Sequence, residues 1–258
     1  MKKDIVLQGK HIRKSFGRGR PESFVLNDVS VDIYAGDFTV IMGASGAGKS
    51  TLLYSLSGMD GITSGQVFYQ GQDISAYKEQ QMAALRAKEF GFVFQQTHLV
   101  SNLTLFENVA VAGYVGKHGK EALSAEVVSA RAWELLTRMG VRNAGDRLPS
   151  EVSGGEAQRA ALARAVINKP GLVFADEPTG ALNKANSREV LELLSGMNED
   201  GQSILMVTHD VKSAVRGTRI LYMEDGRILD TLEMSPYQEE DARSREEKVS
   251  KWLSALLW

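Results

Sequence analysis

The chain has 258 residues, of which 43% are hydrophobic and 24% charged, and its formal net charge is −2. This length and composition suit a globular domain with an embedded lobe and exclude disordered and collagen-like chains. The balanced charge argues against a nucleic-acid partner, and the lack of cysteine excludes disulfides and thiolate metal sites. No apolar run reaches the roughly 20 residues that cross a bilayer, so we expect no membrane span. The lack of cysteine fits a cytoplasmic protein.

Strand and helix patterns alternate along the chain. The first 35 residues and Gly65–Tyr69 carry short strand signals with turn residues, which predicts a small antiparallel sheet. Buried strands are predicted at three apolar runs, Phe38–Met42, Leu172–Ala175 and Ile204–Val207. Helical patterns lie between and after them, for example at Ser50–Leu56 and Arg188–Leu194. The sequence therefore predicts an α/β fold with a mainly parallel sheet.

The segment from about Leu99 to Leu148 has helical periodicity and no strong strand run. We read it as a helical lobe inserted into the α/β core, and place a helical subdomain at about residues 99–160 of a domain that spans residues 1–235.

Residues 236–258 form a separate tail. A charged stretch, Glu239–Lys251, leads into an apolar stripe at helical spacing that comprises Val249, Trp252, Leu253, Leu256 and Leu257. This pattern predicts an amphipathic helix that packs on its own domain, with docking on a partner subunit as the alternative. Five acids and four bases in residues 239–251 argue against attachment to anionic lipid.

The strongest motif is Gly43-Ala44-Ser45-Gly46-Ala47-Gly48-Lys49-Ser50, which matches G-x-x-x-x-G-K-[ST] between a predicted strand and a predicted helix. Its glycines let the backbone approach a phosphate, which successive N–H groups and the helix N-terminus stabilise. Lys49 then reaches the β- and γ-phosphates, and Ser50 ligates magnesium. The motif, extended to Thr51, predicts a site for ATP and Mg²⁺.

Two acids, Asp176 and Glu177, follow the predicted strand at Leu172–Ala175. Ligands of α/β sheets gather at the carboxyl ends of strands. Beside a phosphate loop, Asp176 suits an outer magnesium ligand and Glu177 a general base for the attacking water. The alternative is a pair of solvated acids.

Further motifs resemble those of the ABC ATPases. Val152–Arg159, which contains Ser153, Gly154, Gly155 and Glu156, resembles the signature usually written LSGGQ. Gln95 in Gly91–Gln95 resembles the Q-loop, and His209 in Val207–Asp210 the switch histidine. Phe16 stands at the adenine-stacking position, where the family more often has tyrosine. The resemblance covers roughly residues 4–230.

The resemblance implies roles for these residues. Phe16 would stack on adenine, Gln95 would ligate magnesium or its water, and His209 would contact the γ-phosphate. The signature would meet the nucleotide of a second copy of the chain, so that two copies sandwich two ATP molecules head to tail.

The segment Gly180-Ala181-Leu182-Asn183 resembles the D-loop, which crosses that dimer interface and usually carries an aspartate at the position of Asn183. We expect Asn183 to weaken the coupling between the two ATP sites. The alternative is that Asn183 simply caps the next helix.

Within the family, Asn102–Val109, Ser153–Glu156 and Ala175–Gly180 resemble the subfamily that serves lipoprotein release, macrolide export and antimicrobial-peptide resistance. This resemblance implies the ATP-hydrolysing subunit of a bacterial transporter, peripheral on the inner face of the cell membrane and coupled to a permease on a separate chain. The alternatives are a soluble ABC ATPase of DNA repair or translation and a nucleotide-binding regulator without turnover. The transported or sensed molecule is set by the partner.

Overall fold

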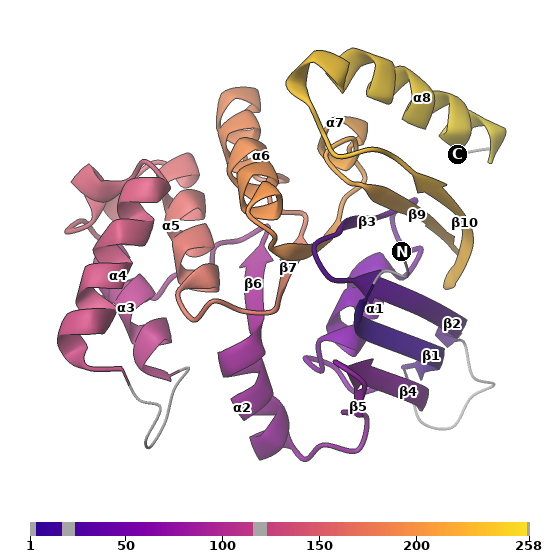
Figure 1. Ribbon diagram of the computed structural model, residues 1–258, viewed down its shortest axis with the longest axis horizontal. Coiled ribbons are helices and arrows are strands. Elements are labelled where there is room, and N and C mark those ends of the chain that lie inside the picture. The colour runs from indigo at the N-terminus through magenta and orange to yellow at the C-terminus, as the bar shows by residue number, and fades with distance from the viewer. Residues whose placement is uncertain (1–3, 17–23, 116–122, 257–258) are drawn as a thin grey trace. The chain divides into compact units, whose positions relative to one another are not determined.

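The computed structural model describes residues 4–16, 24–115 and 123–256. The chain divides into two compact units (Figure 1). Unit 1 comprises Met1–Lys78 and Met197–Trp258, and unit 2 comprises Glu79–Gly196.

The N-terminal part of unit 1 is an antiparallel sheet in the order β2-β1-β4-β5. Its strands are β1 (Ile5–Ser15), β2 (Phe24–Tyr34), β4 (Ser64–Tyr69) and the short β5 (Gln72–Asp73). β1 pairs antiparallel with both β2 and β4. The predicted small antiparallel sheet is therefore confirmed.

The second sheet of unit 1 is built on β3 (Phe38–Met42), which pairs in parallel with β8 (Ser203–Val207) and β9 (Arg219–Glu224). All residues of β3 and β8 are buried, as expected for strands covered on both faces. β10 (Arg227–Glu233) pairs antiparallel with β9 through a turn in which Asp225 and Gly226 have positive φ angles of 44° and 72°. Helix α1 (Lys49–Leu56) follows β3, and α7 (Val211–Ala214) follows β8.

Unit 2 consists mainly of helices. α2 (Glu79–Glu89) leads into β6 (Phe90–Phe94), which pairs in parallel with β7 (Leu172–Asp176). Between these strands lie α3 (Leu105–Val115), α4 (Ala125–Arg138), α5 (Gly154–Val166) and the 3₁₀ turns η2 (Arg142–Ala144) and η3 (Pro149–Glu151). α3 packs against α4 and α5, and α6 (Lys184–Glu199) begins in this unit. The predicted helical segment between Leu99 and Leu148 contains α3 and α4.

The C-terminal tail folds as the turn η4 (Glu239–Asp241) and helix α8 (Ala242–Ala255), which packs within unit 1 (Figure 1). Val249 and Leu253 are buried, and the Trp252 indole donates to Asp230 Oδ2 on β10 at 2.8 Å. Arg245, only 5% exposed, donates to the carbonyls of Val215, Gly217 and Ser235 at 2.7 to 2.8 Å. Helix α8 therefore buries part of the expected apolar stripe within unit 1, while Leu257 lies outside the described residues.

Candidate nucleotide-binding site

The phosphate loop of unit 1 runs between buried strand β3 and helix α1. Two of its glycines are required by close backbone approach and by positive φ. A Cβ on Gly43 (φ 154°) would lie 2.0 Å from the Met223 carbonyl oxygen, and one on Gly48 (φ 97°) would lie 2.8 Å from that of Val25. The loop geometry therefore depends on the glycines of the motif.

Lys49 is folded over this loop. The residue is 7% exposed, and its ammonium donates to the carbonyl oxygens of Gly43 at 2.9 Å and Ala44 at 2.8 Å. α1 begins at Lys49, and among the described residues no side chain caps its N-terminus at Gly48. The first turn of α1 contains no acid, and Ser50 and Thr51 are half-buried there. A lysine ammonium and the positive end of a helix thus meet at one loop, which suits a phosphate.

His209 lies at the same edge of the sheet as the loop. β3 and β8 run in parallel with Ile41 paired to Val207, and the Thr208 N–H donates to the Ile41 carbonyl at 3.2 Å. The next residue, His209, is exposed. Asp210 then caps α7 by accepting from the N–H groups of Lys212 at 3.2 Å and Ser213 at 3.0 Å. The structure therefore brings the switch histidine and the phosphate loop to neighbouring strand ends.

Phe16 follows β1 in the same unit and is 60% exposed. The Lys14 ammonium lies 4.8 Å from the centre of its ring. Lys14 is itself held by Asp60 Oδ1 at 2.7 Å and the Gly61 carbonyl at 2.5 Å. An exposed ring face is what stacking on a base requires.

In unit 2, Gln95 and Glu177 follow the ends of paired strands. Phe94 of β6 is in register with Asp176 of β7 in a parallel pair. The residues that follow, Gln95 and Glu177, therefore leave the two strands at the same edge of the sheet. Glu177 has a φ of 45°, a left-handed conformation that is uncommon for residues with a side chain and frequent at functional sites. A Cβ on Gly180 would lie 3.0 Å from Gln95 Nε2, so the Gln95 amide lies against the D-loop.

The signature forms the N-terminus of α5. Ser153 Oγ accepts from the Glu156 N–H at 3.3 Å, and Glu156 Oε2 accepts from the Ser153 N–H at 2.8 Å and its hydroxyl at 2.7 Å. The bond from the Ser153 backbone N–H lowers the pKa of Glu156 below its ordinary value. Gly155 packs against α6, since a Cβ there would lie 2.4 Å from Asn186 Cγ.

Asn183 directly precedes α6. Its Oδ1 accepts from the Asn186 N–H at 3.0 Å, so Asn183 makes the helix cap that the sequence left as one alternative.

Comparison with known proteins decides the family. The model of the ABC transporter family matches residues 26–180. The chain belongs to the ABC transporter family. The predicted ABC ATPase class and the α/β fold with parallel and antiparallel sheets are thereby confirmed.

One relative of this ABC ATPase is the macrolide export ATP-binding/permease protein MacB of Mannheimia succiniciproducens, 41% identical over 234 residues. These residues cover 90% of this chain and 36% of that protein, so the chain spans about a third of the length of the relative it matches.

Solved structures are similar as well. The ATP-binding cassette MJ0796, solved as a dimer in a post-hydrolysis state bound to ADP and Pi, has a TM-score of 0.82 at 33% identity and covers 90% of this chain and 100% of its own. CbiO1 from Clostridium perfringens, part of the transporter complex cbiONQ, has a TM-score of 0.79 at 23% identity, covers 98% of this chain and 95% of its own, and shares the fold.

Within the described residues of this ABC ATPase, no cluster of three or more His, Asp or Glu side chains is placed to hold a metal ion. None of the helices in the described ranges has the length and apolarity that a membrane crossing requires.

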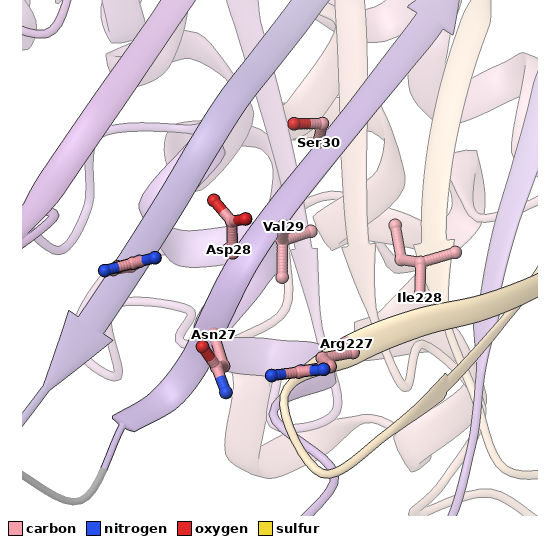
Figure 2. A pocket seen from close by; sticks show the side chains of 7 residues that line it. Asn27, Asp28, Val29, Ser30, Arg227 and Ile228 are labelled. Carbon is pink, nitrogen blue, oxygen red and sulfur yellow. The ribbon is translucent and has the colours of Figure 1, made fainter.

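Unit 1 of the ABC ATPase also contains a cavity of about 390 Å³ (Figure 2). Its lining consists of Arg13, Asn27, Asp28, Val29, Ser30, Arg227 and Ile228. None of these residues belongs to the sequence motifs.

Proposed function

We propose that the chain binds MgATP at its phosphate loop and hydrolyses it as the motor subunit of a bacterial transporter. The observation that carries this proposal is the loop itself, where the buried Lys49 ammonium and the N-terminus of α1 converge beside His209. Such a loop stabilises the negative charge of a triphosphate. The dimeric structure of MJ0796 bound to ADP and Pi supports the nucleotide chemistry.

The proposed roles follow from the side chains. Residues 43–51 hold the phosphates, and Phe16 stacks on adenine. The Ser50 hydroxyl, the Gln95 amide oxygen and the Asp176 carboxylate supply oxygen ligands of the kind that Mg²⁺ prefers, and the ion neutralises charge on the phosphates. Glu177 accepts a proton from the attacking water, and His209 donates a hydrogen bond to the γ-phosphate.

The proposed assembly is a head-to-tail dimer of two copies, in which Ser153, Gly154, Gly155 and Glu156 face the nucleotide held by the second copy. This assembly needs no other subunit, because one chain carries both the phosphate loop and the signature. We further propose that dimer closure drives a permease on a separate chain, with this chain peripheral on the inner face of the membrane. MacB, named for macrolide export, supports export of a macrolide. Export of a lipoprotein or an antimicrobial peptide is proposed from the sequence motifs alone.

A non-transport ABC ATPase of DNA repair would need long coiled-coil arms between the phosphate loop and the signature. The helices that the structure describes in this interval after α1 are α2, α3 and α4, of 11, 11 and 14 residues. They are too short for such arms, and the transporter role is favoured.

The test compares wild type with Glu177→Gln. We expect the variant to bind MgATP in calorimetry like wild type but to hydrolyse it roughly 10²- to 10⁴-fold more slowly, because the general base is lost. A stable dimer in MgATP should then accumulate in sizing experiments. Turnover close to wild type would exclude Glu177 as the base, and a wild type without turnover would exclude the ATPase function. ATPase rates in membranes with and without the co-purified permease then test the coupling.

A further inference from the structure

Helix α5 holds the Q-loop and the segment after Glu177 through one buried amide. Gln158 is 1% exposed, and its Nε2 donates to the Phe94 carbonyl at 2.8 Å and to the Pro178 carbonyl at 2.7 Å. Phe94 directly precedes Gln95, and Pro178 directly follows Glu177. The two N–H groups of this amide therefore connect α5 to the carbonyl just before Gln95 and to the carbonyl just after Glu177.

The other side of the Q-loop is held from the same helix. Arg164 donates from its two terminal guanidinium nitrogens to the carbonyls of His98 at 2.6 Å and Thr97 at 2.7 Å. Gln95 is thus bracketed by Gln158 on its N-terminal side and by Arg164 on its C-terminal side. Because α5 begins at the signature, the helix that carries the signature also holds the backbone on both sides of Gln95.

The surroundings of Gln158 are also unusual for a polar side chain. Gln158 shares the buried face of α5 with Ala157, Ala161 and Leu162, where a polar side chain is retained only if its hydrogen bonds are satisfied. Removing the amide would leave the bonds to two loop carbonyls unmade, and the loops would lose the fixed position that their side chains need.

We propose that Gln158 is a positioning residue that couples the signature helix to Gln95 and Glu177. This inference rests on the proposed function, because those residues act on the nucleotide only if the chain is an ATPase. When the signature engages the nucleotide of the second copy, α5 sets the Q-loop and the Glu177 segment together through the two bonds of Gln158.

The test uses Gln158→Glu, which keeps the shape of the side chain but turns both donated bonds into repulsion between a carboxylate and carbonyls. The matched control is Asn168→Asp. The Asn168 amide also donates to two carbonyls within unit 2, those of Ala87 at 3.1 Å and Ala112 at 2.8 Å, and neither carbonyl adjoins a site residue. Both variants therefore lose the same kind of link, but only one of them loses it beside the proposed site.

We expect Gln158→Glu to lower kcat at least tenfold while MgATP affinity in calorimetry stays within twofold, because the phosphate loop lies in unit 1. Asn168→Asp should lower the melting temperature by a comparable amount and keep kcat within twofold. Should Gln158→Glu fail to fold, Gln158→Met removes the donors without adding charge, and the same loss of kcat is expected.

A kcat within twofold of wild type for the folded Gln158 variant would overturn the proposal. So would an equal loss of kcat in Asn168→Asp, since that result assigns both amides a structural role only. A wild type without turnover is a different outcome, because it removes the proposed function and the inference together.

Discussion

The phosphate loop and the signature both place small residues before a helix, but their helix N-termini differ. α1 starts at Lys49 after Gly48, whose φ is 97°, and within the described ranges no side chain caps it. α5 starts after Ser153, which forms a reciprocal capping box with the acid Glu156. The N-terminus of α1 thus carries the ammonium of Lys49, whereas the N-terminus of α5 carries the carboxylate of Glu156.

From this difference we infer how the two regions would divide the binding of a nucleotide. The phosphate loop concentrates positive potential, so we expect a free triphosphate to gain most of its binding energy there. At the signature, the Glu156 carboxylate already offsets part of the helix dipole and accepts from the Ser153 N–H. The signature therefore keeps its shape without a ligand, and we expect it to bind phosphate weakly unless the phosphate is already held by another loop.

The largest expected effect comes from Lys49→Ala. Removing a charged hydrogen-bond donor costs about 2 to 3 kcal/mol, which corresponds to a loss of about 30- to 140-fold in MgATP affinity. Calorimetry on the purified chain measures it. The matched control is Lys248→Ala, which removes the same charge from an exposed position of α8 in the same unit. This variant should bind MgATP like wild type. Equal affinity in the two variants would contradict the assignment of the phosphate loop.

A smaller effect is expected for Glu156→Gln, because glutamine keeps the capping box but loses its charge. Charge-assisted bonds are about twice as strong as neutral ones, so we expect a loss of about 0.5 to 1 kcal/mol in the free energy of unfolding at pH 7.

The pH dependence of this loss has a definite sign. Bonds from Ser153 lower the pKa of Glu156 in the folded chain, so their stabilisation is present above the unfolded value, near 4.3, and is lost as pH falls through the folded pKa. Urea unfolding at pH 7 and at about pH 3.5 should therefore show a difference between wild type and variant that shrinks in acid. A difference that is the same at both pH values would contradict the charge argument.

The smallest expected effect is that of Asn183→Asp. The observed bond to the Asn186 N–H supports the cap, for which Asn and Asp are nearly equivalent. If Asn183 also weakens coupling between two ATP sites, aspartate should raise the Hill coefficient or the rate by about twofold without changing the affinity of the first site. ATPase rates measured against ATP concentration, with the permease present, decide between a helix cap alone and an additional role in coupling. Identical curves would leave the cap as the only role.

Much of the fold was predictable because its strands are contiguous apolar runs. The predicted range Phe38–Met42 is β3, and β7 and β8 each extend one residue beyond the predicted ranges. The β9–β10 hairpin was missed, although an apolar run before Asp225-Gly226 carries its signal in the sequence.

The parts of the site that could not be predicted depend on tertiary contacts. Gln158 bonds to carbonyls 64 and 20 residues away, and no spacing in the sequence reveals those partners. The tail was predicted as a helix from its period, but the surface it covers is set by Arg245, which reaches carbonyls 28 and 30 residues earlier in the chain.

The most direct test of the account mixes two inactive variants. Lys49→Ala removes the phosphate-contacting cation of the loop and leaves the signature intact. Gly154→Asp places an acid in the signature and leaves the loop intact. In a head-to-tail dimer, each mixed pair contains one site with an intact loop and an intact signature.

The ATPase rate of an equimolar mixture is therefore the decisive measurement. Half of the dimers are mixed and one of their two sites is intact, so we predict recovery of up to about a quarter of the wild-type rate. Each variant alone should stay near background. A mixture no more active than either variant alone would contradict the claim that the loop of one copy and the signature of another form one site.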